Sequence, residues 1–424
     1  MKKNAIEGSR DQGPNAALLM SLLPTAAMFS ELREFVVQSG IRVLAAVLEQ
    51  ERAAVCGPRY QHQPERAATR SGSSTGTLVL GGRKVRVKRP RAHAANGDEV
   101  VLPSWARFTA EDPLIDRTVE QMVVGVSTRK YERSLEPIDD GVEATATSKS
   151  AVSRRFVAAT QAQLDEWLGT DLSGLNLVAL MIDGIHFGEH LVLCALGIDA
   201  SGAKHVLGLW EGATENATAC RDLLTNLRER GVRTDRTILV VIDGGKALAK
   251  AVRQVFGKRA LIQRCQVHKM RNVLDQLPEK MRVSVRKAMN DAYRTGKVER
   301  AKRLLNNLER RLQPKHPGAA ASLREGLDET LTVMAFGLDH TLERTLSTTN
   351  PIENLNGTTR HVARRVKQWQ GGSMVLRWVA AGVREASKGF RRLRGCDGMK
   401  RLITQLTLHD RKQNSTVDAA QEAA

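Results

Sequence analysis

The sequence predicts an α/β domain whose mixed sheet is flanked by helices, and the order of its segments carries that prediction. Three strand-like runs follow one another from Leu175: "LNLVALMID", "EHLVLCALGID" and "KHVLGLW". Helical and strand-like segments then alternate, as "ACRDLLTNLRERG", "RTILVVID", "KALAKAVRQVFG" and "ALIQRCQVH". A meander of strands followed by this alternation is typical of a layered domain with a mixed sheet.

The residues before this domain predict a helix and a β-hairpin. Residues 31–55 have helical spacing, and Cys56-Gly57-Pro58 ends the helix. Residues 76–91, "GTLVLGGRKVRVKRPR", predict two short strands about a Gly81-Gly82 turn. The second strand gathers basic side chains with no acid among them: Arg83, Lys84, Arg86, Lys88, Arg89 and Arg91. Such a basic ribbon either lies along phosphates or is an edge strand protected by its charges.

Other segments predict helices. "STRKYERSL" and "SKSAVSRRFVAATQAQL" predict two serine-capped helices that resemble a helix-turn-helix, although capped pairs also occur in bundles that bind no DNA. Residues 269 to about 347 have helical patterns and no strand pattern. A helical region rich in lysine and arginine follows Asn354, and residues 413–424 lack periodicity, which predicts disorder.

The composition narrows the class of protein. The chain has 424 residues, with 65 lysines and arginines against 46 acids and a formal net charge of +19. This imbalance favours a polyanionic partner such as nucleic acid over a merely soluble basic surface. The five cysteines are odd in number and widely spread, so they form no disulfide framework and suit a reducing cytoplasm.

No part of the sequence predicts a membrane span. The apolar segment of residues 16–29 has the length of a signal-peptide core, but Pro24 interrupts it, and Glu7 and Asp11 are out of place in a basic leader. We expect this segment to be amphipathic and to pack on its own domain. Elsewhere the sequence has no unbroken window of about 18 apolar residues.

Two strand ends repeat one pattern. "LVALMIDG", residues 177–184, and "ILVVIDGG", residues 238–245, each end an apolar run in an aspartate and a glycine, sixty positions apart. Asp183-Gly184 is also a good turn dipeptide, and Asp243 could cap the helix that follows it. Glu353 could complete a capping box in which Asn350 is the cap. Individually, none of these acids requires a catalytic role.

Together the three acids suggest a metal site. Two aspartates at the ends of neighbouring strands and a glutamate on the first turn of a helix can converge on a small volume. Hard oxygen ligands at such a point suit Mg²⁺, which keeps room for substrate phosphates. Two such ions about 4 Å apart can activate an attacking oxygen and stabilise the leaving oxygen in phosphodiester displacement.

The motifs also resemble those of a known family. "MIDG", "VIDGGKAL", "RCQVHK" and "NPIENLNGTTR", in this order, resemble the mutator-type transposases of bacterial insertion sequences, part of the DDE group with a ribonuclease-H-like catalytic fold. The agreement in order, context and spacing extends from the basic ribbon to Trp378. The resemblance implies a transposase that binds terminal inverted repeats, nicks the element ends with two Mg²⁺ or Mn²⁺ ions, and joins the freed 3′ hydroxyl to target DNA.

The resemblance assigns roles to individual residues. Asp183 would bind both metal ions, Asp243 would hold one and Glu353 the other. Cys265 and His268 match a Cys-x-x-His signature of the group, and we expect them to orient or pack, because the pair is two ligands short of a usual zinc site. Arg360, two helical turns after Glu353, either grips a phosphate beside the metals or is a solvated charge. Further candidates for DNA contact are His268, Arg364, Arg365 and the ribbon residues Arg83, Lys84, Arg86, Lys88 and Arg89.

The patterns and the resemblance together predict six segments. They are an N-terminal DNA-binding region (1–110), a helical segment with a candidate helix-turn-helix (111–172), the first part of the ribonuclease-H-like domain (173–268), a helical insertion (269–348), the rest of that domain with a basic helix (349–395) and a C-terminal tail (396–424). Because element ends must be paired before joining, we expect a homodimer on double-stranded DNA, in the bacterial cytoplasm and associated with the nucleoid.

Two alternatives remain open. One is a non-catalytic DNA-binding protein descended from a transposase, although such a binder would not need the three acids and Arg360. The other is a structure-specific nuclease on the same fold, which the long basic N-terminal region makes less fitting. A phosphate-loop ATPase is excluded, because "DGGKAL" lacks the Gly-x-x-x-x-Gly-Lys-Ser/Thr pattern.

Overall fold

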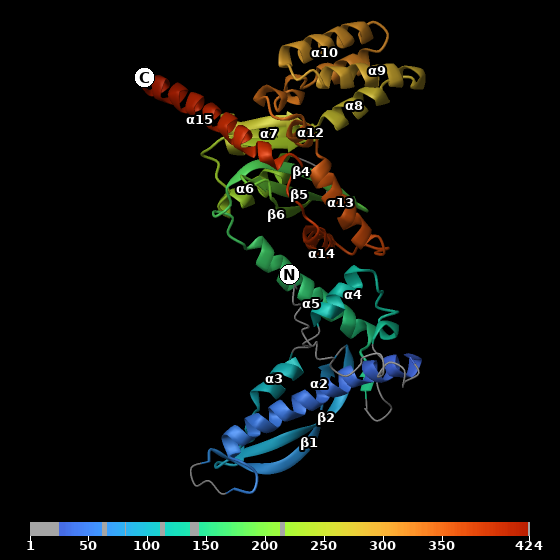
Figure 1. Cartoon of the computed structure of the whole chain (residues 1–424), viewed down its shortest axis with the longest axis vertical. Helices are drawn as coiled ribbons and strands as arrows, with labels where there is room; N and C mark the ends of the chain where they lie inside the picture. Colours follow the sequence, from blue (N-terminus) through green and yellow to red (C-terminus); the bar gives the residue numbers. More distant parts are fainter. Residues whose placement is uncertain are drawn as a thin grey trace, which may run out of the picture. The chain divides into compact units, whose positions relative to one another are not determined.

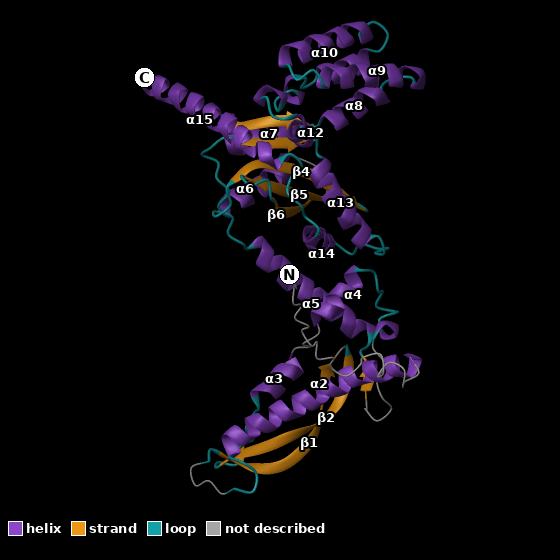
Figure 2. Ribbon diagram, viewed as in Figure 1, coloured by secondary structure: helices purple, strands orange, loops and turns teal. Residues whose placement is uncertain are grey.

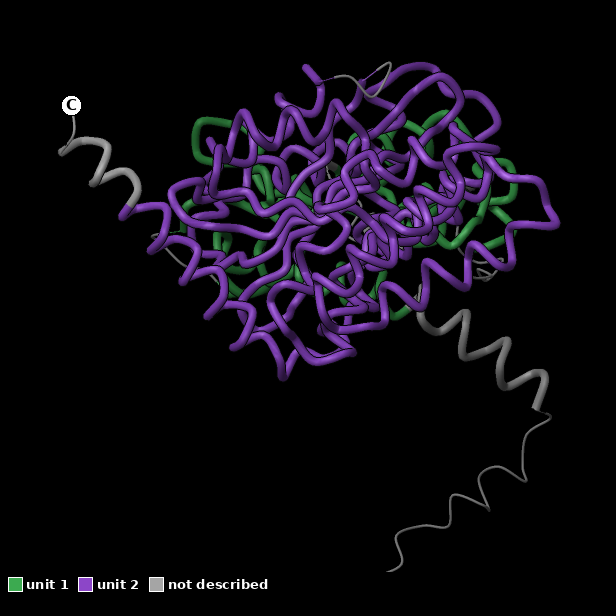
Figure 3. The backbone as a smooth tube through the Cα atoms, turned by 90° about the horizontal axis from the view of Figure 1, so that it is seen from above, with its two compact units in different colours: residues 1–159 green, residues 160–424 purple. Residues whose placement is uncertain are grey.

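The chain divides into two units, residues 1–159 and 160–424, which Figure 3 colours separately. The computed structural model describes residues 25–61, 66–80, 82–110, 115–135, 144–212 and 217–422. Most of the apolar segment 16–29, and Gly81 of the predicted turn, lie outside these residues. The division after residue 159 falls within the segment 111–172 that the sequence analysis treats as one piece.

A β-hairpin packed on a long helix forms the main hydrophobic cluster of the first unit. The elements of this unit include α2 (Thr25–Cys56), β1 (Ala68–Leu80), β2 (Arg83–Ala94), α3 (Pro103–Ala110), α4 (Ile115–Val123) and the short β3 (Ala144–Ala146), which pairs with β2. Leu44 and Leu48 of α2 are buried against Leu78, Val85 and Val87 of the hairpin. The predicted helix and hairpin are confirmed, with a third strand that no sequence pattern indicated.

Residues 127–135 do not form the predicted helix. They form turns and the 3₁₀ helix η1 (Glu132–Ser134). The buried Tyr131 shares a hydrogen bond with Thr118 of α4, and the side-chain amide of Gln121 donates to the carbonyl of Ser134. Tertiary contacts thus override the helical pattern. The second predicted helix is confirmed as α5 (Lys149–Leu168).

The second unit is built around a mixed sheet (Figure 1). Its strands are β4 (Leu177–Phe187), β5 (His190–Asp199), β6 (Lys204–Gly212), β7 (Ile238–Ile242) and β8 (Ala260–Arg264), in the order β6-β5-β4-β7-β8. β4, β5 and β6 form an antiparallel meander, whereas β7 and β8 run parallel to β4. The predicted α/β domain with a mixed sheet is confirmed.

Helices cover both faces of this sheet. On one face, residues such as Leu180 and Val240 pack with α6 (Ala217–Glu229) and α7 (Lys246–Phe256). On the other, Met181 and Val241 pack with α13 (Asn350–Ala363), α14 (Gly372–Lys388) and the first part of α15 (Met399–Glu422). Because both faces are buried, these strands have nearly continuous apolar sequences.

The chain between β8 and α13 is helical, as its pattern predicts. It forms α8 (Gln266–Asp275), α9 (Glu279–Tyr293), α10 (Val298–Leu312), α11 (Pro317–Arg324) and α12 (His340–Leu346). Figure 2 shows α8, α9 and α10 gathered beside one another. Val285, Met289, Leu305 and Leu323 belong to a hydrophobic cluster of these helices, separate from the two clusters of the sheet.

The C-terminal segment is helical, and the disorder predicted for residues 413–424 is wrong for the part that the structure describes. α15 continues to Glu422, and Met399 and Leu402 bury its first turns in the sheet core. The carboxylate of Asp410 accepts hydrogen bonds from Thr237 and Arg259, which fixes the helix farther along. No glycine or proline follows Gly398 to end it. Neither this helix nor another in the described ranges has the length and apolar character that a bilayer span requires.

Candidate active site

The ends of three neighbouring strands bring candidate residues to one level of the sheet. Ile182 of β4 lies opposite Ile242 of β7, and Ile242 lies opposite the last residue of β8. Because the three strands run parallel, the next residue of each, Asp183, Asp243 and Cys265, stands at the same level. The N–H of Cys265 continues the ladder by donating to the carbonyl of Ile242 at 2.8 Å.

Strand alternation turns Asp183 toward the face that α13 covers. Met181 and Ile185, two positions away on either side, are fully buried in the core with α13 and α14. Asp183 shares their face, because successive side chains of a strand alternate. Gly184 points to the other face, where an added Cβ would lie 2.8 Å from Leu191. The Asp-Gly pair therefore combines a carboxylate on one face with close packing on the other.

Helix α13 brings Glu353 and Asn356 to this face. Ile352 and Leu355 are buried in the same core and fix the rotation of the helix. The fully buried side-chain amide of Asn356 donates to Oδ2 of Asp183 at 2.7 Å. Its amide oxygen has no hydrogen-bond partner in the part of the chain that the structure describes. Sequence reasoning missed Asn356, although its position three residues after Glu353 on the same helical face was an available signal.

Thr349, directly before α13, joins Glu353 to the Cys-x-x-His pair. Its hydroxyl oxygen lies 2.5 Å from Oε1 of Glu353, 3.3 Å from Sγ of Cys265 and 3.3 Å from Nδ1 of His268. Since a hydroxyl has one proton, the short contact with the carboxylate is the bond that it donates. The N–H of Thr349 also donates to Sγ of Cys265 at 3.4 Å. Thr349 is a second residue that the motifs did not reveal.

The capping roles that could have explained two of the acids are not formed. The N-cap of α7 is Gly245, whose N–H donates to Oδ1 of Asp243 at 2.9 Å. The N-cap of α13 is Thr349, and no side chain caps this helix. Glu353 accepts its hydrogen bond from the Thr349 hydroxyl, so it does not complete a capping box with Asn350.

Negative charge is concentrated at this site. Burial and the Asp243 carboxylate raise the pKa of Asp183, against the hydrogen bond from Asn356. A hydrogen bond with Cys265 and the charges of Cys265, Glu353 and Asp243 raise the pKa of His268, against its burial. Burial opposes ionisation of Cys265, but hydrogen bonds with His268 and Thr349 outweigh it and lower the pKa of the thiol. His268 thus interacts electrostatically with all three acids, and the site favours positive charge.

Two sets of side chains could hold a cation here. Ligand atoms of Cys265, His268 and Glu353 lie within 4.8 Å of one another, and no other group of three such side chains in the described ranges meets that distance. The ligand atoms of Asp183, Asp243 and Glu353 do not all lie within 4.8 Å of one another. Carboxylates that bind different ions of a pair about 4 Å apart need not come so close, however. The all-oxygen set suits Mg²⁺, and the set with sulfur and nitrogen suits Zn²⁺.

The predicted arginines of α13 lie at its surface. Arg360 is exposed on the helical face of Glu353 and has no partner among the residues described. Arg364 and Arg365 are exposed at the end of the helix. These positions leave all three side chains accessible to a large polyanion.

The basic ribbon of the first unit is split by strand alternation. Its exposed members are Lys84, Arg86 and Lys88, while Val85 and Val87 between them are buried. Arg83 is half-buried. Arg89 and Arg91 both pair with the carboxylate of Glu99. One face of β2 therefore presents basic side chains to solvent. The last two basic residues of the strand form ion pairs within the first unit.

The chain is similar to known proteins over most of its length. A family model described as "Transposase, Mutator family" matches residues 20–392. The transposase for insertion sequence element ISRM5 of Rhizobium meliloti is 28% identical over 353 residues, which are 82% of this chain and 86% of that protein. The transposase for insertion sequence element IS256 in transposon Tn4001 of Staphylococcus aureus is 27% identical over 336 residues, 76% and 82% of the two chains. The transposase for insertion sequence element IS6120 of Mycolicibacterium smegmatis is 30% identical over 242 residues, 56% and 72%.

Proposed function

The chain belongs to the Mutator family of transposases, and we propose that it cleaves and joins DNA strands with Asp183, Asp243 and Glu353. The family and the named relatives support an insertion-sequence transposase. The observation that carries the catalytic part is the register of β4 and β7, which sets Asp183 and Asp243 at one level of adjacent parallel strands. Glu353 adds a third carboxylate from α13, and all three interact with His268.

The catalytic domain has a ribonuclease-H-like fold in this proposal. Three antiparallel strands followed by two strands parallel to the first, with helices on both faces, support that assignment. The hydrophobic cluster of α8 to α11 supports treating residues 269–348 as a helical insertion between the second aspartate and the glutamate. The first unit, with its basic ribbon, would serve as the N-terminal DNA-binding region.

The three carboxylates would hold two Mg²⁺ or Mn²⁺ ions. Their donors are oxygens, which these hard cations prefer. Burial beside Asp243 raises the pKa of Asp183, a sign of excess negative charge that a divalent cation relieves. Asp183 would contact both ions, Asp243 one and Glu353 the other. When bound, such ions supply activation of the attacking oxygen and stabilisation of the leaving oxygen.

Neighbouring groups orient each carboxylate. Asn356 donates to Oδ2 of Asp183, the hydroxyl of Thr349 donates to Oε1 of Glu353, and the N–H of Gly245 donates to Oδ1 of Asp243. Each acid thus has one oxygen aligned by a donor, and orientation of this kind reduces the reorganisation that catalysis needs. When protonated, the imidazole of His268 adds positive charge among the acids.

Exposed cations would bind the DNA backbone. Arg360, on the face of Glu353, would contact a phosphate near the acids, with Arg364 and Arg365 farther along. Lys84, Arg86 and Lys88 would contact the terminal inverted repeats from the ribbon. Pairing two element ends requires two active sites, so we propose a homodimer on DNA, working in the bacterial cytoplasm at the nucleoid.

A strand-cleavage assay tests the proposal. Purified protein is incubated with Mg²⁺ and labelled duplexes that carry the ends of its element, and nicked and joined products are separated by length. Asp183→Asn keeps the size of the side chain and removes one charge, so we expect a loss of activity of about 10³-fold or more. Asp222→Asn, on α6 at the opposite face of the sheet, is the matched control and should keep full activity.

Three results decide against the proposal. Full activity of Asp183→Asn would remove the catalytic assignment. Wild-type protein that binds the ends in Mg²⁺ without breaking any strand would favour the non-catalytic DNA-binding protein. Cleavage that shows no dependence on the end sequence, and no joined product, would favour the nuclease.

A further inference from the structure

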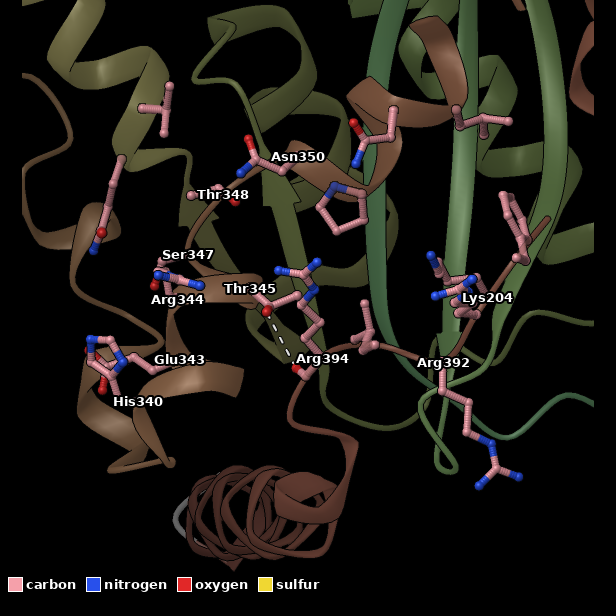
Figure 4. Close-up of a pocket in the computed structure, with 18 of the residues that line it drawn as sticks. Lys204, His340, Glu343, Arg344, Thr345, Ser347, Thr348, Asn350, Arg392 and Arg394 are labelled. Carbon is pink, nitrogen blue, oxygen red and sulfur yellow. Dashed lines mark hydrogen bonds between the residues drawn. The ribbon is translucent and has the colours of Figure 1, made fainter. Parts of the chain in front are cut away.

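A large groove lies along one side of α13 (Figure 4). Its volume is about 1440 Å³. α13 contributes Asn350, Asn354 and Thr358, which recur every four residues, whereas Glu353 and Asn356 belong to the other side of the helix. The remaining walls come from the start of α8, the end of α9, α12 and the loop after α14. The groove and Glu353 therefore lie on different sides of α13.

The groove is lined with arginines from three separate elements. They are Arg294 after α9, Arg344 on α12, and Arg391, Arg392 and Arg394 after α14. All five are exposed, and their guanidinium groups have no partner among the residues that the structure describes. The hydroxyl of Thr345 donates to the carbonyl of Arg394 at 3.3 Å, and this bond connects the loop after α14 to α12.

Acidic side chains do not neutralise these charges. Glu343 and Glu385 are the acids that line the groove in the described ranges. Glu385 pairs with Lys388 on its own helix at 2.8 Å. Glu343 is half-buried, and burial raises the pKa of its carboxyl. Lys204 adds a further positive charge, held over the ring of Phe390 at 5.1 Å.

Two buried hydroxyls at the wall of the groove have unused hydrogen-bonding capacity. Ser347 is 1% exposed and Thr348 is 6% exposed, and both line the groove. Neither hydroxyl has a partner among the described residues. A buried polar group without a partner is costly, and a ligand or water usually satisfies it. The N-terminus of α13 follows directly and adds partial positive charge. The wall thus favours an anion with acceptor oxygens.

We propose that this groove binds the phosphate backbone of a DNA segment that lies away from the bond being cut. The inference rests on the proposed function, since it takes DNA as the substrate. Arginines spread over three elements suit an extended polyanion better than one phosphate, and each guanidinium fork matches a phosphate. Two segments have this chemistry: the DNA that flanks the element end, and the target DNA.

The test removes charge from the groove and measures binding without divalent cations. The variant Arg391→Gln/Arg392→Gln/Arg394→Gln changes three exposed side chains. Its control is Arg310→Gln/Arg311→Gln/Lys315→Gln, which removes the same charge from exposed positions at the end of α10 and in the turn after it, outside the groove. Affinity is measured over a range of salt concentrations for two duplexes, an element end with its flank and an unrelated sequence as target.

Loss of phosphate contacts has a defined signature. Each lost contact reduces the slope of log affinity against log salt by about 0.9, so the groove variant should lose about 2 to 3 in slope and bind about 10- to 100-fold more weakly near 0.1 M salt. The control variant should lose less than a third of that. A loss only with the element end identifies the flank as the occupant, and a loss only with the unrelated duplex identifies the target.

A second variant shows whether a weaker affinity comes from lost charge or from a changed conformation of the loop after α14. Arg294→Gln/Arg344→Gln should reduce the slope by about 1 to 2, because it removes two arginines from other walls. If both groove variants keep the wild-type slope with both duplexes, the inference is wrong. Asp183→Asn distinguishes this failure from failure of the proposed function: it tests cleavage, whereas the groove variants test binding in the absence of metal.

Discussion

Replacing Asp183 with asparagine should stabilise the metal-free protein while it abolishes strand cleavage. Asp183 is half-buried beside the core that β4 forms with α13, and Asp243 stands at the same level, directly after the neighbouring strand. Burial and Asp243 raise its pKa. A carboxylate whose pKa is raised on folding destabilises the folded state at every pH above that pKa, because its charged form is favoured in the unfolded chain.

The size of the effect follows from strand geometry. Adjacent strands are about 4.8 Å apart, and two like charges at that separation would repel each other with about 3 kcal/mol at an effective dielectric constant near 20. The interaction of Asp183 with His268 lowers the pKa of Asp183 and offsets part of this repulsion. Asparagine keeps an acceptor for the amide of Asn356, so the hydrogen bond at this position is retained. We expect a net gain of about 1–3 kcal/mol, or about 2–8 °C in the melting temperature of the second unit.

Thermal unfolding in EDTA and in Mg²⁺ measures this gain. In EDTA, Asp183→Asn should have a higher melting temperature than the wild type. The control Asp222→Asn should have the melting temperature of the wild type. Mg²⁺ should raise the melting temperature of the wild type, since a ligand of the folded state stabilises it, and should raise that of Asp183→Asn much less. An Asp183→Asn protein that melts at or below the wild-type temperature in EDTA would refute the account of charge repulsion at this site.

Three further predictions concern packing, pH and backbone geometry. Leu355→Ala leaves a cavity between α13 and the sheet, where Leu355 is 2% exposed, and should cost about 2–5 kcal/mol in urea unfolding of the second unit; an unchanged midpoint would show that α13 is not held by this core. Hydrogen bonds from His205 and Ser201 outweigh burial and lower the pKa of Asp199, so Asp199→Asn should cost about 0.5–1 kcal/mol near neutral pH, after allowance for solvent screening. That cost should vanish as the pH falls through the lowered pKa, because the stability is present only while the carboxylate is ionised, and a cost independent of pH would contradict the assignment. Gly82 has a φ of +79°, and an added Cβ would meet the hydroxyl of Tyr131. Gly82→Ala should therefore destabilise the first unit by about 1–3 kcal/mol, more than Gly97→Ala, which has a φ of +87° but no atom within 4 Å of the added Cβ; equal effects would mean that Tyr131 moves aside freely.

Much of the second unit could be predicted from local patterns. The apolar runs that end at Asp183 and Asp243 predicted buried strands, and "KALAKAVRQVFG" predicted the helix between β7 and β8. The parallel register of β4, β7 and β8 could not be predicted this way, because it depends on pairings between segments far apart in the chain. That register is what aligns Cys265 with the two aspartates.

Features built from distant segments were also missed. Asn356 contacts Asp183 across 173 positions of sequence, and Thr349 contacts Cys265 across 84. The groove gathers arginines from positions 294, 344, 391, 392 and 394, each of which is an ordinary surface charge in its own helix or loop. Residues 127–135 show the opposite error, where a convincing local pattern gives way to the burial of Tyr131.

The claim that three distant acids share metal ions can be tested directly by iron-mediated cleavage of the protein backbone. Fe²⁺ replaces Mg²⁺ in the protein bound to DNA, peroxide then generates hydroxyl radicals at the ions, and the fragments are mapped by mass spectrometry. We predict cuts close to residues 183, 243 and 353, all suppressed by excess Mg²⁺ and all lost in Asp183→Asn. Cuts confined to residues 265–268 and 353, with none near 183 or 243, would assign the ion to Cys265, His268 and Glu353 instead and would contradict the proposed site.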